Sequence, residues 1–364
     1  MKILCITDQF EGSDHSSIEG IFGRYLREWC EVYMVYFVRD ANSGRREGDK
    51  IYIPYRYKRH GLTKVLHKFI PLDNVDIVIV RNFFRVLKDI LVSRKNFGYR
   101  VGFWHSFPHS YRRLFEAKKE KRAIFRKTIE HKLRTYSEKK LVSRCDFLLT
   151  MSKEFKDRFY ADIDIRHLPL PMGVSFEVSS QLTYEANRVM KFLYTGTVDH
   201  LRETDVVVKA FSELEEDFEF DIFTRSDNST TRYIQNLDNP KIRLYPAVPR
   251  SELFHKMAHY DVGVGLIADN SLYDVASPTK TIEYYSVGLP ALVNYLPEYV
   301  SLFDNGSAFF CQFTKEDIKV AVRAALITPK DKLVEMGRKG RAIIKKQRDY
   351  KVLSEGLYRF LGAL

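Results

Sequence analysis

The sequence has no long apolar run, although it contains 364 residues. A helix that crosses a membrane needs about 20 consecutive, mostly apolar residues, and no stretch approaches that length. The opening segment MKILCITDQF has one Lys and then alternates like a strand, so we expect no signal peptide. We therefore predict a protein that works in the cytoplasm and does not span a membrane.

Cysteine is scarce as well. The four cysteines, Cys5, Cys30, Cys145 and Cys311, are scattered through the chain with no paired spacing. Disulfide frameworks and thiolate metal sites both need cysteines at regular spacings, so the sequence argues against each of them. We expect reduced thiols in a cytoplasmic protein.

Positive charge, in contrast, is abundant and unevenly placed. The formal net charge is +12, and residues 111–144 alone hold thirteen Lys or Arg against four Glu, a local charge of +9. Such a concentration favours a local anionic partner. A solvated helix face is one alternative, and nucleic acid is another, although no known nucleic-acid motif accompanies the charge. We expect a peripheral contact with the inner face of an anionic cell membrane, where each Lys or Arg adds about 1 kcal/mol, and no nucleic acid.

Length and pattern predict an α/β protein of two domains. A chain of this size favours two domains over one. Strand-like apolar runs alternate with helical patterns twice over, which predicts two doubly wound parallel sheets. The polar stretch 175–189 predicts a linker. We place a first domain at 1–180, a second at 190–347 and a terminal helix at 348–364.

The predicted elements are as follows. Strands are expected at 2–8, 32–38, 51–55, 75–80, 100–105, 146–152, 191–195, 219–224, 242–246, 261–267, 291–293 and in SAFFCQF. Helices are expected from Phe22 to Trp29, at 83–95, from Thr204, and at 229–237, 314–326, 330–347 and 350–362. The basic stretch 112–143 reads as one long or two broken helices. Its apolar residues form a stripe: Leu114, Phe115, Ile124, Phe125, Ile129, Leu133, Tyr136 and Leu141.

The segment SPTKTIEYYSVGLP, residues 277–290, contains a complete set of helix signals. Ser277 is a good N-cap, and Pro278 fits the first helical position. Thr279 and Lys280 then offer free N–H groups and a cation at the positive end of the helix dipole, which makes an anion site. Gly288 is a typical C′ residue.

This segment resembles the donor-nucleotide motif of GT-B glycosyltransferases, most closely family 4 (group 1). The resemblance rests on Ser-Pro, then Lys280, then Glu283-Tyr284, then Gly288-x-Pro290, after a strand that opens with Asp261. It covers the second half of the chain well and the first half loosely. It implies two Rossmann-like domains facing a central cleft, with the last helix crossing back to the first domain. It also implies a nucleotide-diphosphate sugar as donor, with no further cofactor and no metal.

The resemblance further implies which residues bind the donor. Glu283 would hold the ribose, and Arg202 and Lys280 would stabilise the diphosphate, since a guanidinium fits phosphate oxygens. Family members often carry a first Glu eight positions before Glu283, but Val275 stands there, and the adjacent Asp274 could substitute only if the loop shifts by one residue. The full set expected at the donor is Gly196, Thr197, Arg202, Thr224, Arg225, Val248, Ser277, Pro278, Thr279, Lys280 and Glu283, with Arg250 beside the base.

The acceptor side is expected in the first domain. His105 ends the strand 100–105, where the family often has a His near the reacting sugar carbon, so we expect His105 to act in catalysis with Arg202 and Lys280. The alternative is a structural His in an aromatic loop, the commoner fate of such a residue. The expected acceptor residues are Gly12, Asp14, His15, Gly20 and His109.

The sequence thus predicts a metal-independent hexosyltransferase (EC 2.4) that acts in bacterial surface-polysaccharide synthesis, with retention of configuration. Its acceptor would be a glycan or a polyprenyl-linked glycan. Two alternatives stay open: a GT-B-fold nucleotide-sugar epimerase, and a catalytically degenerate binding partner.

Overall fold

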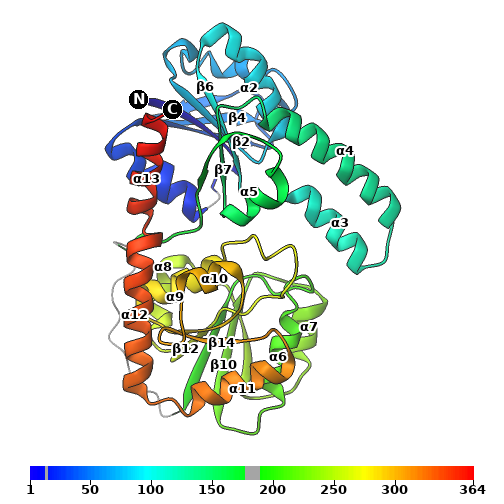
Figure 1. The fold of residues 1–364 in the computed structure, drawn as a ribbon, viewed down its shortest axis with the longest axis vertical. Helices are drawn as coiled ribbons and strands as arrows, with labels where there is room; N and C mark the ends of the chain where they lie inside the picture. Colours follow the sequence, from blue (N-terminus) through cyan, green and yellow to red (C-terminus); the bar gives the residue numbers. More distant parts are fainter. Residues whose placement is uncertain (13–14, 177–188) are drawn as a thin grey trace. The chain divides into compact units, whose positions relative to one another are not determined.

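The structure, a computed structural model, describes residues 1–12, 15–176 and 189–364. Contacts divide the chain into two units, Met1–Pro171 with Tyr350–Leu364, and Met172–Asp349 (Figure 1). Each unit is built on its own sheet. Most of the linker expected at 175–189 falls on 177–188, outside the described residues.

The first unit contains an eight-stranded sheet of order β3-β4-β2-β1-β5-β6-β7-β8, in which only the β3–β4 pair is antiparallel. Its central strands, such as IVIVR in β5, are buried along their whole length, as expected for parallel strands covered on both faces. The strands are β1 (Lys2–Phe10), β2 (Glu31–Val38), β3 (Arg45–Glu47), β4 (Lys50–Pro54), β5 (Ile77–Arg81), β6 (Arg100–His105), β7 (Phe147–Thr150) and β8 (Arg166–Pro169).

The helices of the first unit mostly follow the predicted pattern. They are α1 (Leu62–Leu66), α2 (Phe84–Phe97), α3 (His109–Lys119), α4 (Ile124–Val142), α5 (Lys153–Tyr160) and α13 (Tyr350–Gly362), with 3₁₀ turns η2 (Tyr25–Glu28), η3 (Tyr55–Lys58) and η4 (Leu72–Asn74). The helix expected from Phe22 to Trp29 is instead a π-helix, η1 (Ile18–Arg24), followed by η2. Phe22, Tyr25 and Leu26 are nevertheless all buried.

The basic stretch forms two helices, α3 and α4, and most of its apolar stripe is exposed. Leu114 is buried, but Phe125, Leu133 and Tyr136 are 80%, 67% and 71% exposed. No helix among the described residues combines the length and apolar character needed to cross a bilayer.

The second unit contains a six-stranded parallel sheet of order β11-β10-β9-β12-β13-β14. The strands are β9 (Met190–Thr195), β10 (Phe218–Thr224), β11 (Ile242–Pro246), β12 (Val262–Val264), β13 (Ala291–Asn294) and β14 (Ala308–Cys311). The helices are α6 (Thr204–Ser212), α7 (Ser229–Gln235), α8 (Arg250–Met257), α9 (Thr279–Val287), α10 (Pro297–Leu302), α11 (Lys315–Leu326) and α12 (Lys330–Arg348).

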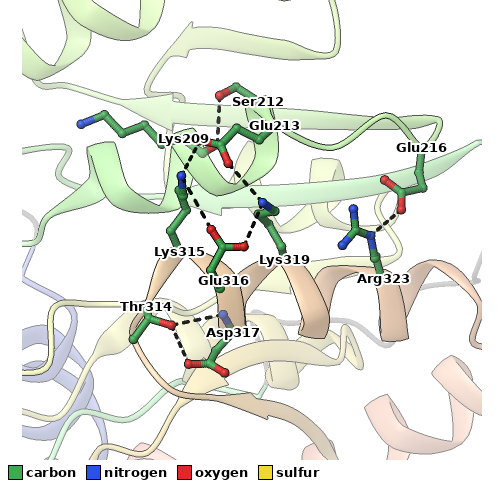
Figure 2. Close-up of polar contacts among 10 residues, drawn as sticks. All are labelled: Lys209, Ser212, Glu213, Glu216, Thr314, Lys315, Glu316, Asp317, Lys319 and Arg323. Carbon is green, nitrogen blue, oxygen red and sulfur yellow. Dashed lines mark hydrogen bonds and ion pairs between the residues drawn. The ribbon is translucent and has the colours of Figure 1, made fainter.

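Helix α11 packs beside α6, and a polar network covers this contact (Figure 2). The Thr314 hydroxyl caps α11 by accepting from the Asp317 N–H at 3.2 Å. Glu213 forms ion pairs with Lys315 at 2.7 Å and with Lys319 at 3.1 Å. These pairs are largely exposed, so each adds at most about 1 kcal/mol, and the apolar core beneath them carries the packing.

The last helix, α13, belongs to the first unit, where it packs on η1 and η2 (Figure 1). Its Tyr350 ring lies so close to Gly20 that a Cβ there would come within 2.2 Å of the ring. Tyr350, Leu357 and Leu361 are buried in the same apolar cluster as Phe22. The cysteines are all free thiols, as expected.

Candidate functional site

Parallel α/β sheets bind ligands at the carboxyl ends of their strands, beside the point where the strand order reverses. In the first sheet this switch point lies between β1 and β5, and in the second sheet between β9 and β12. The residues that follow these four strands therefore occupy the places where a ligand site is expected in each unit.

Two cations lie at the switch point of the second sheet. Arg202, in the loop after β9, donates from Nη1 to Oδ2 of Asp199 at 2.6 Å. Lys280, in the first turn of α9, places Nζ 3.8 Å from the ring centroid of Tyr194, the next-to-last residue of β9. The structure therefore brings together Arg202 and Lys280, the two cations predicted from the motif.

Within the described residues Lys280 forms no ion pair, and its Nζ donates to the Leu266 carbonyl at 3.2 Å. Burial lowers its pKa well below 10.5, and nearby Arg202 lowers it further, against the opposing effect of Asp199. Helix α9 begins beside it, and its N-cap residue, Pro278, provides no side-chain hydrogen bond to the N–H groups of the first turn. A diphosphate would supply both the missing charge and the missing acceptors.

Glu283 is held in place by an arginine. Its Oε1 lies 2.9 Å from Nη2 of Arg250, and the two side chains are 13% and 25% exposed. The Nε of Arg250 is buried and has no hydrogen-bond partner among the described residues. Glu283, the residue expected to bind the ribose, is therefore oriented by Arg250, the first residue of α8, which the sequence predicts to lie beside the base.

The structure corrects the predicted cap of α9. Pro278, rather than Ser277, is the N-cap residue, and α9 begins at Thr279. Ser277 therefore lies one residue too early to reach the helix N–H groups. Its hydroxyl instead donates to Glu298 at 2.7 Å and accepts from the Met172 N–H at 3.1 Å. Gly288 ends the helix with φ 89°, as predicted.

The other expected donor residues lie around the same strand ends. Gly196 follows β9 with φ 121°, and a Cβ there would meet nothing within 4 Å, so the backbone leaves open space for a ligand. Thr197 and Arg225 are exposed, Val248 is half-buried, and Thr224 is buried. Val275 is buried, whereas Asp274 is half-buried.

A polar cluster that the sequence analysis missed lies at the switch point of the first sheet. Asp8 of β1 pairs with Arg81, the last residue of β5. Asn82 follows with φ 58° and donates to Asp8 at 3.0 Å and to Ser106 at 2.9 Å. A non-glycine residue in this conformation is strained, and such strain gathers at functional sites.

His105 lies at the end of β6, next to this cluster. Its side chain is buried among Phe84, Phe103 and Phe155, and Nδ1 is 2.7 Å from the hydroxyl of Tyr160. Burial lowers the pKa of His105 to about 3, and His109 contributes to the shift. The imidazole is therefore neutral at ordinary pH, and it lines a pocket together with His109.

The expected acceptor residues have unequal surroundings. The Nε2 of His15 lies 3.0 Å from Nη2 of Arg81, which adds His15 to the cluster. Gly12 is exposed with φ 75°. Gly20 has a packing role against Tyr350. Asp14 lies outside the described residues.

A metal centre requires several ligand side chains in one place. Within 1–12, 15–176 and 189–364, no three His, Cys, Asp or Glu side chains gather in that way.

Solved structures of known proteins match the whole chain. Sucrose-phosphate synthase from Thermosynechococcus elongatus has a TM-score of 0.75 at 12% identity, over 100% of this chain and 99% of that one. The UDP-forming trehalose-phosphate synthase of Burkholderia xenovorans, in complex with glucose-6-phosphate, has 0.68 at 11%, over 99% of each chain. The lipopolysaccharide outer core galactosyltransferase WaaB, in its apo form, has 0.67 at 13%, over 100% and 99%. The chain has the GT-B fold. No protein-family model and no curated protein matches the sequence.

The residues at the switch point of the second sheet follow local sequence patterns, whereas those at the switch point of the first sheet do not. Arg202, Lys280 and Glu283 belong to a continuous motif or to a recognisable strand-to-loop segment. Asp8 and Arg81 are far apart in the chain and meet only because β1 and β5 are neighbours. Their one sequence signal is that each stands at the end of an apolar run, followed by polar residues.

Proposed function

We propose that this GT-B protein is a glycosyltransferase that moves a sugar from a nucleotide-diphosphate sugar to a glycan or lipid-linked glycan. The observation that carries the proposal is the meeting of Arg202, Lys280 and the uncapped start of α9 at one switch point. Positive charge stands there, where a departing nucleoside diphosphate gains negative charge. The neighbours include a UDP-forming synthase and a galactosyltransferase, which supports the same reaction class.

In this proposal the second unit binds the donor and the first unit binds the acceptor. Arg202, oriented by Asp199, contacts the diphosphate together with Lys280. Glu283, oriented by Arg250, binds the ribose hydroxyls. These cations take the role that a metal has in other transferases, so the proposed reaction needs no metal.

His105 has a positioning role in the proposed reaction. With a pKa of about 3 it does not exchange a proton near neutral pH, but its neutral imidazole can orient a hydroxyl by hydrogen bonding. Membership of family 4, with retention of configuration, is supported by the motif around Lys280 and Glu283. Asp274 is the carboxylate nearest in sequence to the missing first Glu.

The setting proposed is bacterial surface-polysaccharide synthesis at the inner face of the cell membrane. The exposed stripe on α4 supports the membrane contact. Phe125, Ile129, Leu133 and Tyr136 share one helical face by their spacing, and all four are exposed. Exposed Lys132 and Lys140 lie beside them. Exposed apolar residues with flanking cations are the features of a helix that lies on anionic lipid.

Calorimetric titration with UDP, GDP, ADP and CMP, without added metal, tests the donor site. We expect micromolar binding of one nucleotide, and loss of that binding in Glu283→Ala but not in the matched control Glu252→Ala, an exposed carboxylate on α8. Arg202→Ala should lower turnover by about 10²- to 10³-fold. Unaltered binding in Glu283→Ala would remove this residue from the site.

A second assay identifies the reaction. Nucleotide release from the matching nucleotide sugar only after an acceptor is added supports a transferase. Interconversion of the sugar without acceptor would indicate an epimerase. Failure to bind any nucleotide, with or without anionic vesicles, would indicate a degenerate binding partner.

A further inference from the structure

The first unit contains a pocket of about 520 Å³ whose wall is strongly cationic. It lies among η3, α2, α3 and α4, and its floor includes Asn82 and His105 at the carboxyl ends of β5 and β6. This volume is in the range of small-molecule sites. Five cations line the pocket: Lys58, Arg85, Lys88, Arg113 and Arg134.

The cations of the pocket are poorly compensated. Among the described residues, Arg85, Lys88 and Arg113 form no ion pair. Arg134 pairs with Glu130 at 3.1 Å, a carboxylate outside the pocket lining. Glu138 is the one carboxylate in the lining, and burial raises its pKa to about 7 against the opposing effects of Arg134 and Arg113, so this single carboxylate faces five cations. Arg85 and Lys88 are exposed to water, which screens part of their repulsion, and an anion in the pocket would reduce it further.

Two helices also begin at this pocket. Phe83, Phe84 and Arg85, at the start of α2, line it, and so do His109 and Ser110 at the start of α3. Neither helix has a side-chain cap, and both begin at the pocket with the positive ends of their dipoles, although the His109 N–H donates to the Phe107 carbonyl at 2.9 Å. Two helix starts and five cations around one hollow provide what phosphate oxygens bind.

Helix α4 connects the pocket with the exposed apolar stripe. Arg134, Ser137, Glu138 and Leu141 line the pocket at the spacing of one helical face. The stripe, with Phe125 and Leu133, lies on another face of the same helix. One element therefore carries both an anion pocket and a surface suited to lipid.

We propose that this pocket binds a phosphate or diphosphate group of the acceptor, so that the acceptor is a phosphate ester of a lipid rather than a neutral sugar. The proposal rests on the transferase function proposed above, and it names the acceptor class. Phosphate oxygens would contact Arg85, Lys88 and Arg113, with the first turns of α2 and α3 behind them.

The test titrates the full-length protein with inorganic pyrophosphate and with farnesyl diphosphate below its micellar concentration. Three sets of substitutions are used. Arg85→Gln/Lys88→Gln removes two pocket charges from exposed positions. Lys68→Gln/Lys95→Gln removes two exposed charges that do not line the pocket. Arg202→Ala/Lys280→Met removes both cations of the second unit's anion site, and it is the background in which the other two variants are compared.

We expect Arg202→Ala/Lys280→Met to retain binding of both probes, and this background with Arg85→Gln/Lys88→Gln added to bind them about 10- to 100-fold more weakly. The background with the matched control Lys68→Gln/Lys95→Gln added should keep the affinity of the background. If the matched control weakened binding equally, the loss of affinity would follow from overall charge rather than from the pocket, and the proposal would be overturned. Binding of pyrophosphate but not of its farnesyl ester would overturn the lipid assignment. None of these readouts uses a nucleotide, so they stand apart from failure of the donor titration.

Discussion

At the scale of single residues, burial and neighbouring charges shift the pKa of a side chain away from the usual value of its residue type. Lys280 and Glu138 are ordinary in sequence, yet burial lowers the pKa of the first and raises that of the second to about 7. Both groups are therefore poised to change protonation when a charged ligand arrives.

Lys280 should take up a proton when a nucleoside diphosphate binds. The free protein disfavours the ammonium, whereas the added negative charge favours it, so binding raises the pKa of Lys280. Affinity should therefore weaken as pH rises through the lowered pKa, towards 10.5. Calorimetry in buffers of different ionisation enthalpy measures this uptake. Lys280→Met should abolish it, and an unchanged uptake in that variant would assign the proton to another group.

Residues of one local motif could be predicted from the sequence, whereas residues that meet through the sheet could not. Lys280 and Glu283 are three positions apart and were predicted together. Asp8, Arg81 and Ser106 converge only through the strand order. Gly20 was predicted to face the acceptor. In the structure it packs against Tyr350, which is distant in the chain and leaves no room for a Cβ at this position. No pattern in the segment itself indicates that contact.

At the scale of elements, the periodicity of α4 predicted a helix but not what covers it. An apolar stripe of this spacing normally faces a core. Here the first unit covers Val142 and leaves Phe125 and Leu133 in solvent. Whether a stripe is buried depends on neighbouring elements, and the sequence of the helix does not contain that information. The π-helix at Ile18–Arg24 escaped prediction for a similar reason, since the sequence there fits an α-helix equally well.

The exposed stripe should mediate binding to lipid. Phe125→Ser/Leu133→Ser should lower the affinity for anionic vesicles, measured by co-sedimentation, by roughly 100-fold or more, because each apolar side chain withdrawn from the interface loses about 1.5–3 kcal/mol. Val320→Ser/Ile327→Ser, which changes equally exposed apolar residues in and after α11, is the matched control. Co-sedimentation that is unchanged by the Phe125→Ser/Leu133→Ser substitutions, or that does not depend on the anionic lipid content, would count against membrane contact.

At the scale of the whole molecule, the second unit is an insertion within the first. The chain leaves the first unit after Pro171 and returns at Tyr350. The two crossing segments meet at Val174, whose N–H donates to the Arg348 carbonyl at 2.9 Å. The alternation of strands and helices sufficed to predict two sheets. The exact crossing residues were not predicted, because a linker and a helix junction have no strong signal.

A chain that ends at Asp349 should lose stability in the first unit alone. Without α13, the cluster around Phe22 and Tyr25 loses Tyr350, Leu357 and Leu361. We expect an additional unfolding transition at lower temperature, with nucleotide binding by the second unit retained. Scanning calorimetry and nucleotide titration measure the two effects. Glu355→Gln/Arg359→Gln, on the exposed face of α13, should leave the melting profile unaltered. An unaltered profile in the truncated chain would contradict the role given to α13.

The late return of α13 has a consequence for synthesis on the ribosome. The first unit emerges first, but its core stays open on the α13 side while residues 172–349 are translated, which takes roughly 10 to 40 seconds. The second unit, made entirely from contiguous residues, has all its parts before the first unit does. The nascent first half must therefore wait with Phe22 and Tyr25 uncovered, which makes it a natural client for chaperones during translation.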